Sequence, residues 1–415
     1  MTPATRLTAA GFVATAVAFG PGRMGFGLFL PAFRQEFALS TSLAGVIASG
    51  GFLAFLLALL ATAWISPRFG ERIPVIAGAL AASLGFAAVA AAGTSVLLAL
   101  GIALAGTSAG LCWAPFNDAA ERVVPDETRA SALSVVSTGT TFGVIAAAGL
   151  AFAVTQGALD WRGAWVGFAL GGLALAGIAW AGVPPRGEPT PPGEAAEQHR
   201  PPGRPSDPDT KPDAEPLSAT FARRAVIPLY SAALCFGMTN AIFLTFAADR
   251  VATAGGLPGL PDEASSAAIF FAYGVCGALG LATGRLEARI GLAALFCAIF
   301  VAGALSLVLI ALAPTSWSAV LGASGLHGAA IMMVSAVFSF WSLRLFPGRG
   351  ALGLTAALLS VAAGSVLGPT LAGLLATAAG PEVMFLAAAV PPLAAALWFG
   401  ARLRRPRPRL PPAEA

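Results

Sequence analysis

Two long stretches without charged residues constrain the fold more than any other feature of this sequence. The 45 residues 73–117 contain no Asp, Glu, Lys or Arg, and neither do the 54 residues 290–343. As helices rising 1.5 Å per residue, such runs would form rods of roughly 70–80 Å, whereas the hydrocarbon core of a membrane is about 30 Å thick. Each run must therefore turn once and cross a membrane twice.

The composition excludes several classes of protein. The chain is 57% hydrophobic and only 11% charged, whereas soluble domains carry about 25% charged residues. A soluble enzyme, a nucleic-acid-binding protein and a disordered scaffold are thereby excluded. The net charge of +4 comes from arginines, which we interpret as residues that set the membrane topology. The sequence has no phosphate-loop motif, no catalytic Ser/His/Asp set outside the spans, and four cysteines without metal-ligand spacing. We expect no enzyme activity, no cofactor and no metal site.

The pattern of apolar runs predicts an all-α membrane protein with twelve transmembrane helices in two pseudo-symmetric six-helix bundles. Strands are not expected, because no alternating pattern survives in these runs and lipid leaves no water to satisfy backbone groups. The expected spans cover 8–30 and 42–65, two helices within 73–117 that turn at 93–95, then 130–154, 163–183, 225–248 and 265–284, two helices within 290–343 that turn near 314–316, and finally 350–379 and 383–401.

A proline-rich segment separates the two groups of six spans. Residues 184–222 contain eleven prolines and almost no large apolar side chains, which predicts a disordered linker. We therefore divide the chain into an N-terminal bundle (1–183), this linker, a C-terminal bundle (223–402) and a basic tail (403–415). Arginines concentrate on the side that holds the linker and the tail, so both termini are expected in the cytoplasm of a bacterial inner membrane. The tail is expected to contact anionic lipid headgroups.

The two halves repeat each other. Arg68 and Gly70 follow the second span, and Arg289 and Gly291 follow the eighth, 221 residues later. A weaker repeat, the dipeptide Phe-Gly, occurs at residues 19–20 of the first span and at 236–237 of the seventh, and it places Arg23 opposite Asn240. Two homologous bundles are what alternating access requires, because one bundle rocks against the other around a central site.

These motifs resemble the major facilitator superfamily of transporters. The loop after the second span is similar to the family's loop signature at Arg68, Gly70 and Arg72, although Ala63 and Pro67 depart from it. The segment 118–132 is similar to the family's loop between spans four and five, and the opening 22–31 most resembles the YbfB-type bacterial branch. The resemblance implies a group of loop residues that control conformation: Arg68, Gly70, Arg72, Arg122, Arg129, Arg289 and Gly291.

A few polar residues within the spans are candidates for substrate binding. Arg23 in the first span, flanked by glycines, could hold a substrate carboxylate through a bidentate pair; alternatively it snorkels to the surface or pairs with Asp249. Asn240 could bond a substrate or tie two helices together. His327, in the tenth span, suits a coupling proton, or it is a neutral histidine bonded to a neighbouring carbonyl.

Tyr230, Tyr273 and Trp113 complete the candidate site as cavity-lining residues. The absence of an acidic residue at mid-membrane argues against carboxylate-driven symport and against export of polycations. We expect a monomeric secondary transporter whose partners are membrane lipids, a small organic anion and, as a candidate coupling ion, a proton. The alternatives are an exporter of neutral or cationic hydrophobic compounds and a non-transporting sensor with the same fold.

Overall fold

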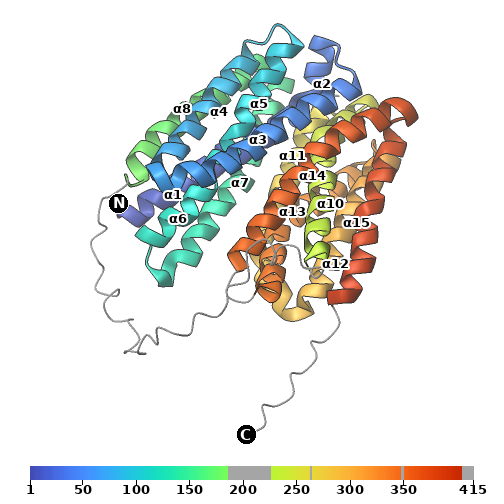
Figure 1. Cartoon of the computed structure of the whole chain (residues 1–415). Coiled ribbons are helices and arrows are strands. Elements are labelled where there is room, and N and C mark those ends of the chain that lie inside the picture. Colours follow the sequence, from blue (N-terminus) through green and yellow to red (C-terminus); the bar gives the residue numbers. More distant parts are fainter. Residues whose placement is uncertain (186–225, 262–263, 347–349, 404–415) are drawn as a thin grey trace, which may run out of the picture.

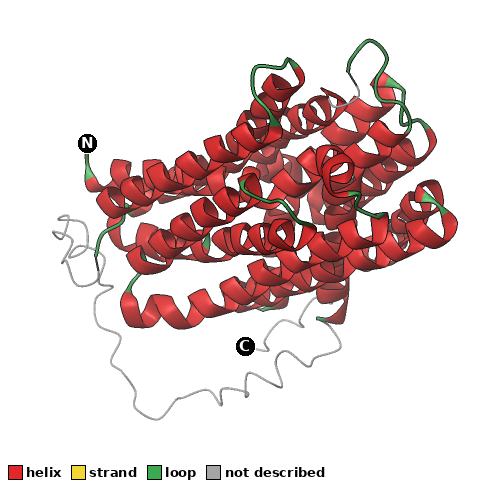
Figure 2. Cartoon of the chain, turned by 90° about the horizontal axis from the view of Figure 1, so that it is seen from above, coloured by secondary structure: helices red, strands yellow, loops and turns green. Residues whose placement is uncertain are grey.

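The computed structural model describes residues 1–185, 226–261, 264–346 and 350–403. All regular structure in these ranges is helical (Figure 2), which confirms the expected all-α class. Most of the predicted linker, from residue 186 onward, and the tail beyond residue 403 lie outside the described residues. The proposed domain limits therefore stay predictions.

Helices of the two halves follow one another along the chain (Figure 1). The first half comprises α1 (Pro3–Phe19), α2 (Pro21–Phe37), α3 (Thr41–Phe69), α4 (Arg72–Ala90), α5 (Ser95–Cys112), α6 (Ala114–Val123), α7 (Asp126–Thr155) and α8 (Trp161–Gly182). The second half comprises α10 (Ile227–Thr253), α11 (Ala264–Gly277), the 3₁₀ helix η1 (Ala278–Ala282), α12 (Thr283–Leu312), α13 (Trp317–Leu345), α14 (Gly350–Ala379) and α15 (Pro381–Leu403).

We interpret these helices as twelve crossings of the membrane. Eleven segments of the described chain are long and apolar enough to span a membrane, and one of them, Ala264–Leu312, has 49 residues. Its helix changes direction at Gly291, whose backbone is non-helical (φ 80°, ψ 159°), so this segment crosses twice. The two predicted turns are confirmed, because α4 and α12 end at Ala90 and Leu312 and the next helices start at Ser95 and Trp317.

The first span differs from its prediction. It was expected as one helix over 8–30, but it runs from Pro3 to Phe37 as α1 and α2, with a break at Gly20 (ψ −99°). The break follows from Pro21, which has no backbone N–H to continue the helical bonding and is tolerated as the first residue of a new helix. Charged residues beyond the apolar window do not end the helix, because water satisfies them there.

Small residues allow the repeated helix pairs to approach closely. Gly139 and Gly143 on α7 lie directly against backbone carbonyls of α1, and Gly364 on α14 lies against the Leu234 carbonyl of α10. The same kind of contact therefore joins α1 with α7 in the first half and α10 with α14 in the second. An added methyl group would overlap with backbone at each of these positions.

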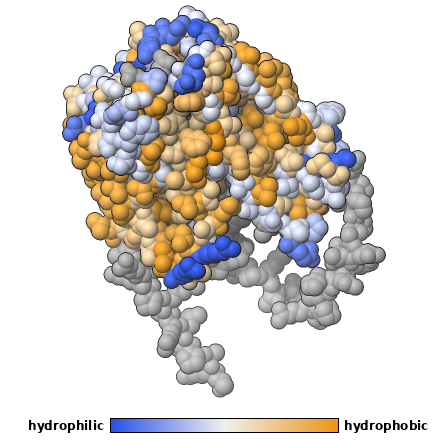
Figure 3. Space-filling view, turned by 180° about the vertical axis from the view of Figure 1, so that it is seen from behind, coloured by the Kyte–Doolittle hydropathy of each residue, from blue (hydrophilic) through white to orange (hydrophobic). Residues whose placement is uncertain are grey.

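The surface and the chain ends define two sides of the molecule. On the face shown in Figure 3, hydrophobic residues cover the middle of the body and hydrophilic residues gather toward its two ends. The N-terminus, the end of α8, the start of α10 and the end of α15 share one side, which we name the terminal side (Figure 1). The loops after α2, α4, α7, α10, α12 and α14 lie on the opposite, far side.

Candidate substrate site

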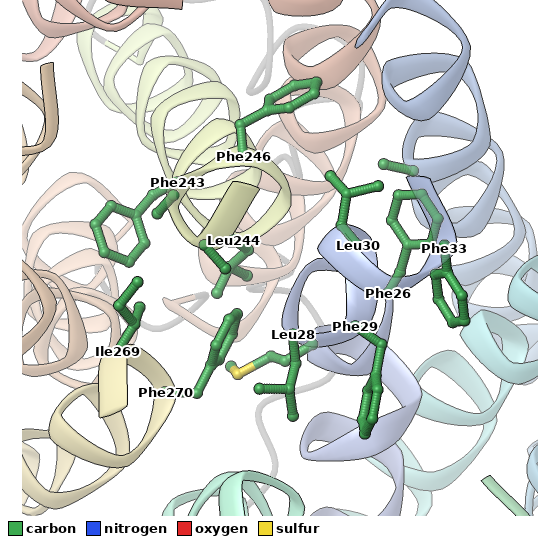
Figure 4. Close-up of a cluster of buried hydrophobic side chains, with 14 of the residues drawn as sticks. Phe26, Leu28, Phe29, Leu30, Phe33, Phe243, Leu244, Phe246, Ile269 and Phe270 are labelled. Carbon is green, nitrogen blue, oxygen red and sulfur yellow. The ribbon is translucent and has the colours of Figure 1, made fainter. Parts of the chain in front are cut away.

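The two bundles meet along three helix pairs, α2 with α10, α3 with α14, and α7 with α11. Among the glycines at this interface, Gly27 of α2 lies closest to backbone of the other bundle, and a methyl group there would overlap with the carbonyl oxygen of Leu244 on α10. Apolar side chains of α2, α10 and α11 surround this contact (Figure 4). The interface is therefore a packed core at this depth.

The far side of the interface is closed by polar links. Arg34 donates a hydrogen bond to Asp249 across the bundles, with 2.6 Å between Nη1 and Oδ2. Nearby, Thr370 of α14 donates its hydroxyl to Ser49 of α3 at 2.8 Å. Because Asp249 is paired with Arg34, the alternative pairing of Arg23 with Asp249 is wrong.

Arg23 extends from α2 into an aromatic environment. Its guanidinium carbon lies 5.0 Å, 5.5 Å and 5.8 Å from the ring centres of Phe55, Phe52 and Phe19. Nε and Nη2, which share one edge of the guanidinium, are buried and have no hydrogen-bond partner among the described residues. Ring faces stabilise a cation but do not replace hydrogen bonds, so this edge has two unsatisfied donors.

A small central cavity lies beside Arg23. Residues of α2, α3, α5 and α10 line it, among them Phe26, Phe52 and Thr245. The space open to the centres of water-sized molecules is about 30 Å³, enough for about two waters at roughly 10–15 Å³ each. The cavity must therefore widen before a substrate enters.

Asn240 lies at the level of α10 that matches Arg23 on α2, but it is not among the residues that line the cavity beside Arg23. Arg23 precedes Gly27 by four residues, and Asn240 precedes Leu244 by four, so each is one helical turn from the point where α2 and α10 touch. Asn240 is fully buried, and neither its Oδ1 nor its Nδ2 has a partner among the described residues. Two unsatisfied polar groups thus occupy matching places on the facing helices.

His327 lies in the interior of the C-terminal bundle. Its ring stacks on Phe243 of α10 at 4.1 Å between centroids, and its Nδ1 is 2.7 Å from Ser306 Oγ. Ser306 Oγ also lies 2.7 Å from the Gly303 carbonyl oxygen, so its hydroxyl can donate either to that carbonyl or to Nδ1, and the histidine tautomer sets the direction of the bond. Nε2 of His327 is buried without a partner among the described residues.

The three aromatic residues that were predicted to line the cavity lie in different parts of the structure. Tyr273 of α11 lies 6.3 Å from the His327 ring; its buried hydroxyl has no partner among the described residues, and it does not line the cavity beside Arg23. Trp113 packs edge-on against Phe19 at 5.3 Å and does not line the cavity. Tyr230 packs in the core of the C-terminal bundle near the start of α10.

The predicted loop residues cluster on the terminal side and bond within their own bundles. Arg122 pairs with Glu71, Arg129 with Asp126, and Arg68 donates to the Trp64 carbonyl. Arg72 donates to the carbonyl of Trp180 and lies over its ring.

The repeated loop glycines share one backbone conformation. Gly70 has φ 78° and ψ 171°, and Gly291 has φ 80° and ψ 159°, which only glycine adopts without strain. Arg289 is exposed beside Gly291. The 221-residue repeat is therefore a structural repeat as well.

Sequence reasoning missed the aromatic and hydroxyl residues that complete the site. Nothing in the sequence distinguishes Phe52 and Phe55 from the other apolar residues of the second span, and Ser306 is one of many small residues in the ninth span. Only the packing of α3 against α5 and of α12 against α13 directs these side chains toward Arg23 and His327.

Solved structures share this fold at low sequence identity. A bacterial homolog of the human lysosomal transporter Spinster, in an inward-facing and unoccupied conformation, superposes with a TM-score of 0.74 at 17% identity, covering 97% of both chains. The nucleoside transporter NupG gives 0.73 at 13% identity over 98% of this chain and all of its own. A POT family transporter in complex with 5-aminolevulinic acid gives 0.74 at 13% identity over 97% and 96%.

The family assignment comes from the sequence itself. No curated protein matches the chain significantly. The profile of the Major Facilitator Superfamily matches residues 11–291, which is more than half of the 415 residues. The chain therefore belongs to the major facilitator superfamily, as a non-enzymatic, multi-pass secondary transporter of a small-molecule substrate.

Proposed function

We propose that this protein transports a small organic anion, and that Arg23 and Asn240 bind it between the two bundles. The observation that carries the proposal is the buried guanidinium edge of Arg23, which has neither a carboxylate nor a carbonyl partner among the described residues. An unpaired charge away from water is costly. A bound oxyanion would remove that cost.

The geometry of the guanidinium favours a carboxylate. Nε and Nη2 form one edge, and two parallel N–H groups on such an edge match the two oxygens of a carboxylate. The phenyl rings of Phe52 and Phe55 around the guanidinium would pack on the apolar part of the substrate. The proposed substrate class is therefore an aromatic or aliphatic carboxylate.

The position of the site supports alternating access. Arg23 belongs to the N-terminal bundle and Asn240 to the C-terminal bundle, so one anion bonded to both would draw the bundles together. Closure on the far side by Arg34 and Asp249 and loop arginines paired within their own bundles on the terminal side fit a conformation that is open toward the terminal side.

His327 is the proposed site of a co-transported proton. Its Nε2, which has no partner among the described residues, can accept a proton when Nδ1 carries the ring hydrogen, and the Tyr273 ring lies 6.3 Å from the His327 ring. A second positive charge nearby is unfavourable as long as Arg23 is unpaired. Anion binding at Arg23 would remove this repulsion, so anion and proton would bind cooperatively.

The remaining proposals concern the membrane topology, the linker, the oligomeric state and the branch of the superfamily. We infer that the terminal side faces the cytoplasm of a bacterial inner membrane, that residues 184–222 form a disordered linker between two domains, and that the protein is a monomer of the YbfB-type branch. The arginine distribution and the opening motif at 22–31 support these points. Reporter fusions at Gly93 and Glu194 test the membrane topology, with Gly93 expected outside and Glu194 inside.

Flux into liposomes tests the proposed function. Purified protein should take up radiolabelled carboxylates but not their primary amides or cationic analogues. Arg23→Gln should abolish uptake, and Arg23→Lys, which keeps the charge but loses the planar edge, should retain a small fraction. The matched control is Arg162→Gln, which removes a partly buried far-side arginine that pairs with Glu36.

Two outcomes would favour the alternatives. Uptake of cationic or neutral hydrophobic compounds with unchanged rates in folded Arg23→Gln protein would favour the exporter. No flux of any member of a broad solute panel would favour the sensor.

A further inference from the structure

The cavity beside Arg23 has a second polar residue in its lining. Among the described residues that line it, all except Arg23 and Thr245 are glycines or apolar residues. Thr245 is buried and belongs to α10, and its Cα lies 3.3 Å from the point where a methyl group on Gly27 would stand. Gly27 follows Arg23 by one helical turn. The two bundles therefore each contribute one polar side chain to the same cavity.

The Thr245 hydroxyl offers lone pairs to this cavity rather than a hydrogen. Its Oγ1 lies 2.7 Å from the carbonyl oxygen of Ala241 in the preceding turn. A carbonyl can only accept, so the hydroxyl donates its one hydrogen to it, and this hydroxyl has no other hydrogen-bond partner among the described residues. Both lone pairs of Oγ1 are left to accept hydrogen bonds from a ligand.

An acceptor beside a guanidinium selects the groups of the ligand that fills the cavity. A carboxylate suits Arg23 but has no hydrogen for Thr245, and a buried acceptor without a donor costs free energy. An ammonium group could donate, but Arg23 repels a second positive charge, and no carboxylate side chain lines the cavity among the described residues. In a cavity this small, a neutral hydroxyl on the ligand is the donor that fits.

We propose that the transported anion is a hydroxycarboxylate, with its carboxylate at Arg23 and its hydroxyl donating to Thr245 Oγ1. This inference rests on the proposed function and narrows its substrate class. Because Arg23 and Thr245 line one small cavity, the hydroxyl lies close to the carboxylate, on one of the first carbons of the chain. Thr245 is then a specificity-determining residue.

Calorimetric titration of the full-length protein tests the proposal with matched ligands. Lactate carries the hydroxyl, its methyl ether keeps the oxygen but has no hydrogen to donate, and propionate lacks both. Mandelate, its methyl ether and phenylacetate form the same series with an aromatic ring. Each hydroxy acid should bind about tenfold more tightly than its deoxy acid, as expected for one hydrogen bond. Each methyl ether should bind no more tightly than the deoxy acid.

Three variants assign this preference to one residue. Thr245→Val replaces the hydroxyl with a methyl group of similar size and should bind hydroxy and deoxy acids about equally, whereas Thr245→Ser keeps the hydroxyl and should retain the preference. The matched control is Thr239→Val. Thr239 is also buried on α10 and donates its hydroxyl to the Cys235 carbonyl at 2.9 Å, but it does not line the cavity, so the control should keep the wild-type preference.

The outcomes separate this inference from the proposed function. Equal binding of hydroxy acids and their methyl ethers by the wild type, or an undiminished preference in folded Thr245→Val, would overturn the role of Thr245. The anion site would survive either result as long as acids bind more tightly than their primary amides. Equal affinity for acids and amides would overturn both the anion site and the hydroxycarboxylate proposal.

Discussion

Replacing Gly27 with alanine should open the far side of the transporter. In the closed interface a methyl group on residue 27 overlaps with the Leu244 carbonyl oxygen, which is backbone and cannot rotate away. The two helices must separate to admit it. The matched control is Gly50→Ala, because an added methyl there meets no atom within 4 Å.

The magnitude follows from the cost of overpacking. One extra methyl group in a packed core costs about 1–3 kcal/mol, and each 1.4 kcal/mol is a factor of ten in an equilibrium constant. The cost falls only on the conformation in which α2 touches α10. The ratio of far-side-open to far-side-closed protein should therefore rise about 5- to 150-fold.

Double electron–electron resonance measures the distances between two spin labels, and the populations of these distances give the ratio of open to closed protein. Labels at Ala158→Cys and Thr315→Cys lie in far-side loops of different bundles, in a background where the four native cysteines are replaced by alanine. The short-distance population should fall in Gly27→Ala and stay at the wild-type level in Gly50→Ala. An unchanged distance distribution in folded Gly27→Ala protein would refute the argument that this contact closes the far side.

Three further substitutions test the far-side ion pair, the proposed proton site and the turn at Gly291. Asp249→Asn removes the charge that pairs with Arg34 and should shift the same spin-label distances toward opening by about 1–3 kcal/mol, because a partly buried guanidinium is left without its carboxylate. His327→Gln should abolish pH-driven accumulation of the anion in liposomes while exchange continues, whereas His199→Gln, in the linker, should keep both. Gly291→Ala should lower stability by about 1–2 kcal/mol, because its φ of 80° strains an L-residue, and the thermal midpoint should fall relative to Gly303→Ala.

Each of these variants can also contradict the account. Unchanged spin-label distances in Asp249→Asn would mean that the pair with Arg34 does not hold the far side closed. Accumulation driven by pH in His327→Gln would remove this histidine from coupling. Equal stability of the two glycine variants would mean that the turn at Gly291 tolerates a side chain.

The fold could be predicted from the sequence because the membrane restricts the choices. Charge-free runs of known length leave only helices, and turns such as 93–95 follow from polar punctuation. The break at Gly20 was missed, because hydropathy does not report where a proline leaves a helix without a donor. The helical extension to Phe37 was missed for a different reason, since helices continue past the apolar window that hydropathy detects.

The candidate site could be predicted only in part. Arg23, Asn240 and His327 stand out as rare polar residues in apolar spans, and the repeat places the first two opposite each other. Phe52, Phe55 and Ser306 could not be found, since nothing distinguishes them from neighbouring residues until helices pack. The pairing of Asp249 with Arg34 rather than Arg23 depends on helix rotation, which a sequence pattern does not give.

The most direct test of the central claim compares carboxylates with their own primary amides. Each pair has nearly the same shape, but only the acid carries the charge that the free edge of Arg23 is proposed to bind. A charge-assisted hydrogen bond is worth about 1.5–3 kcal/mol, so unlabelled acids of increasing size should bind the purified protein roughly 10- to 150-fold more tightly than the matched amides in a calorimetric titration. Equal affinity for acid and amide throughout the series would contradict an anion site at Arg23.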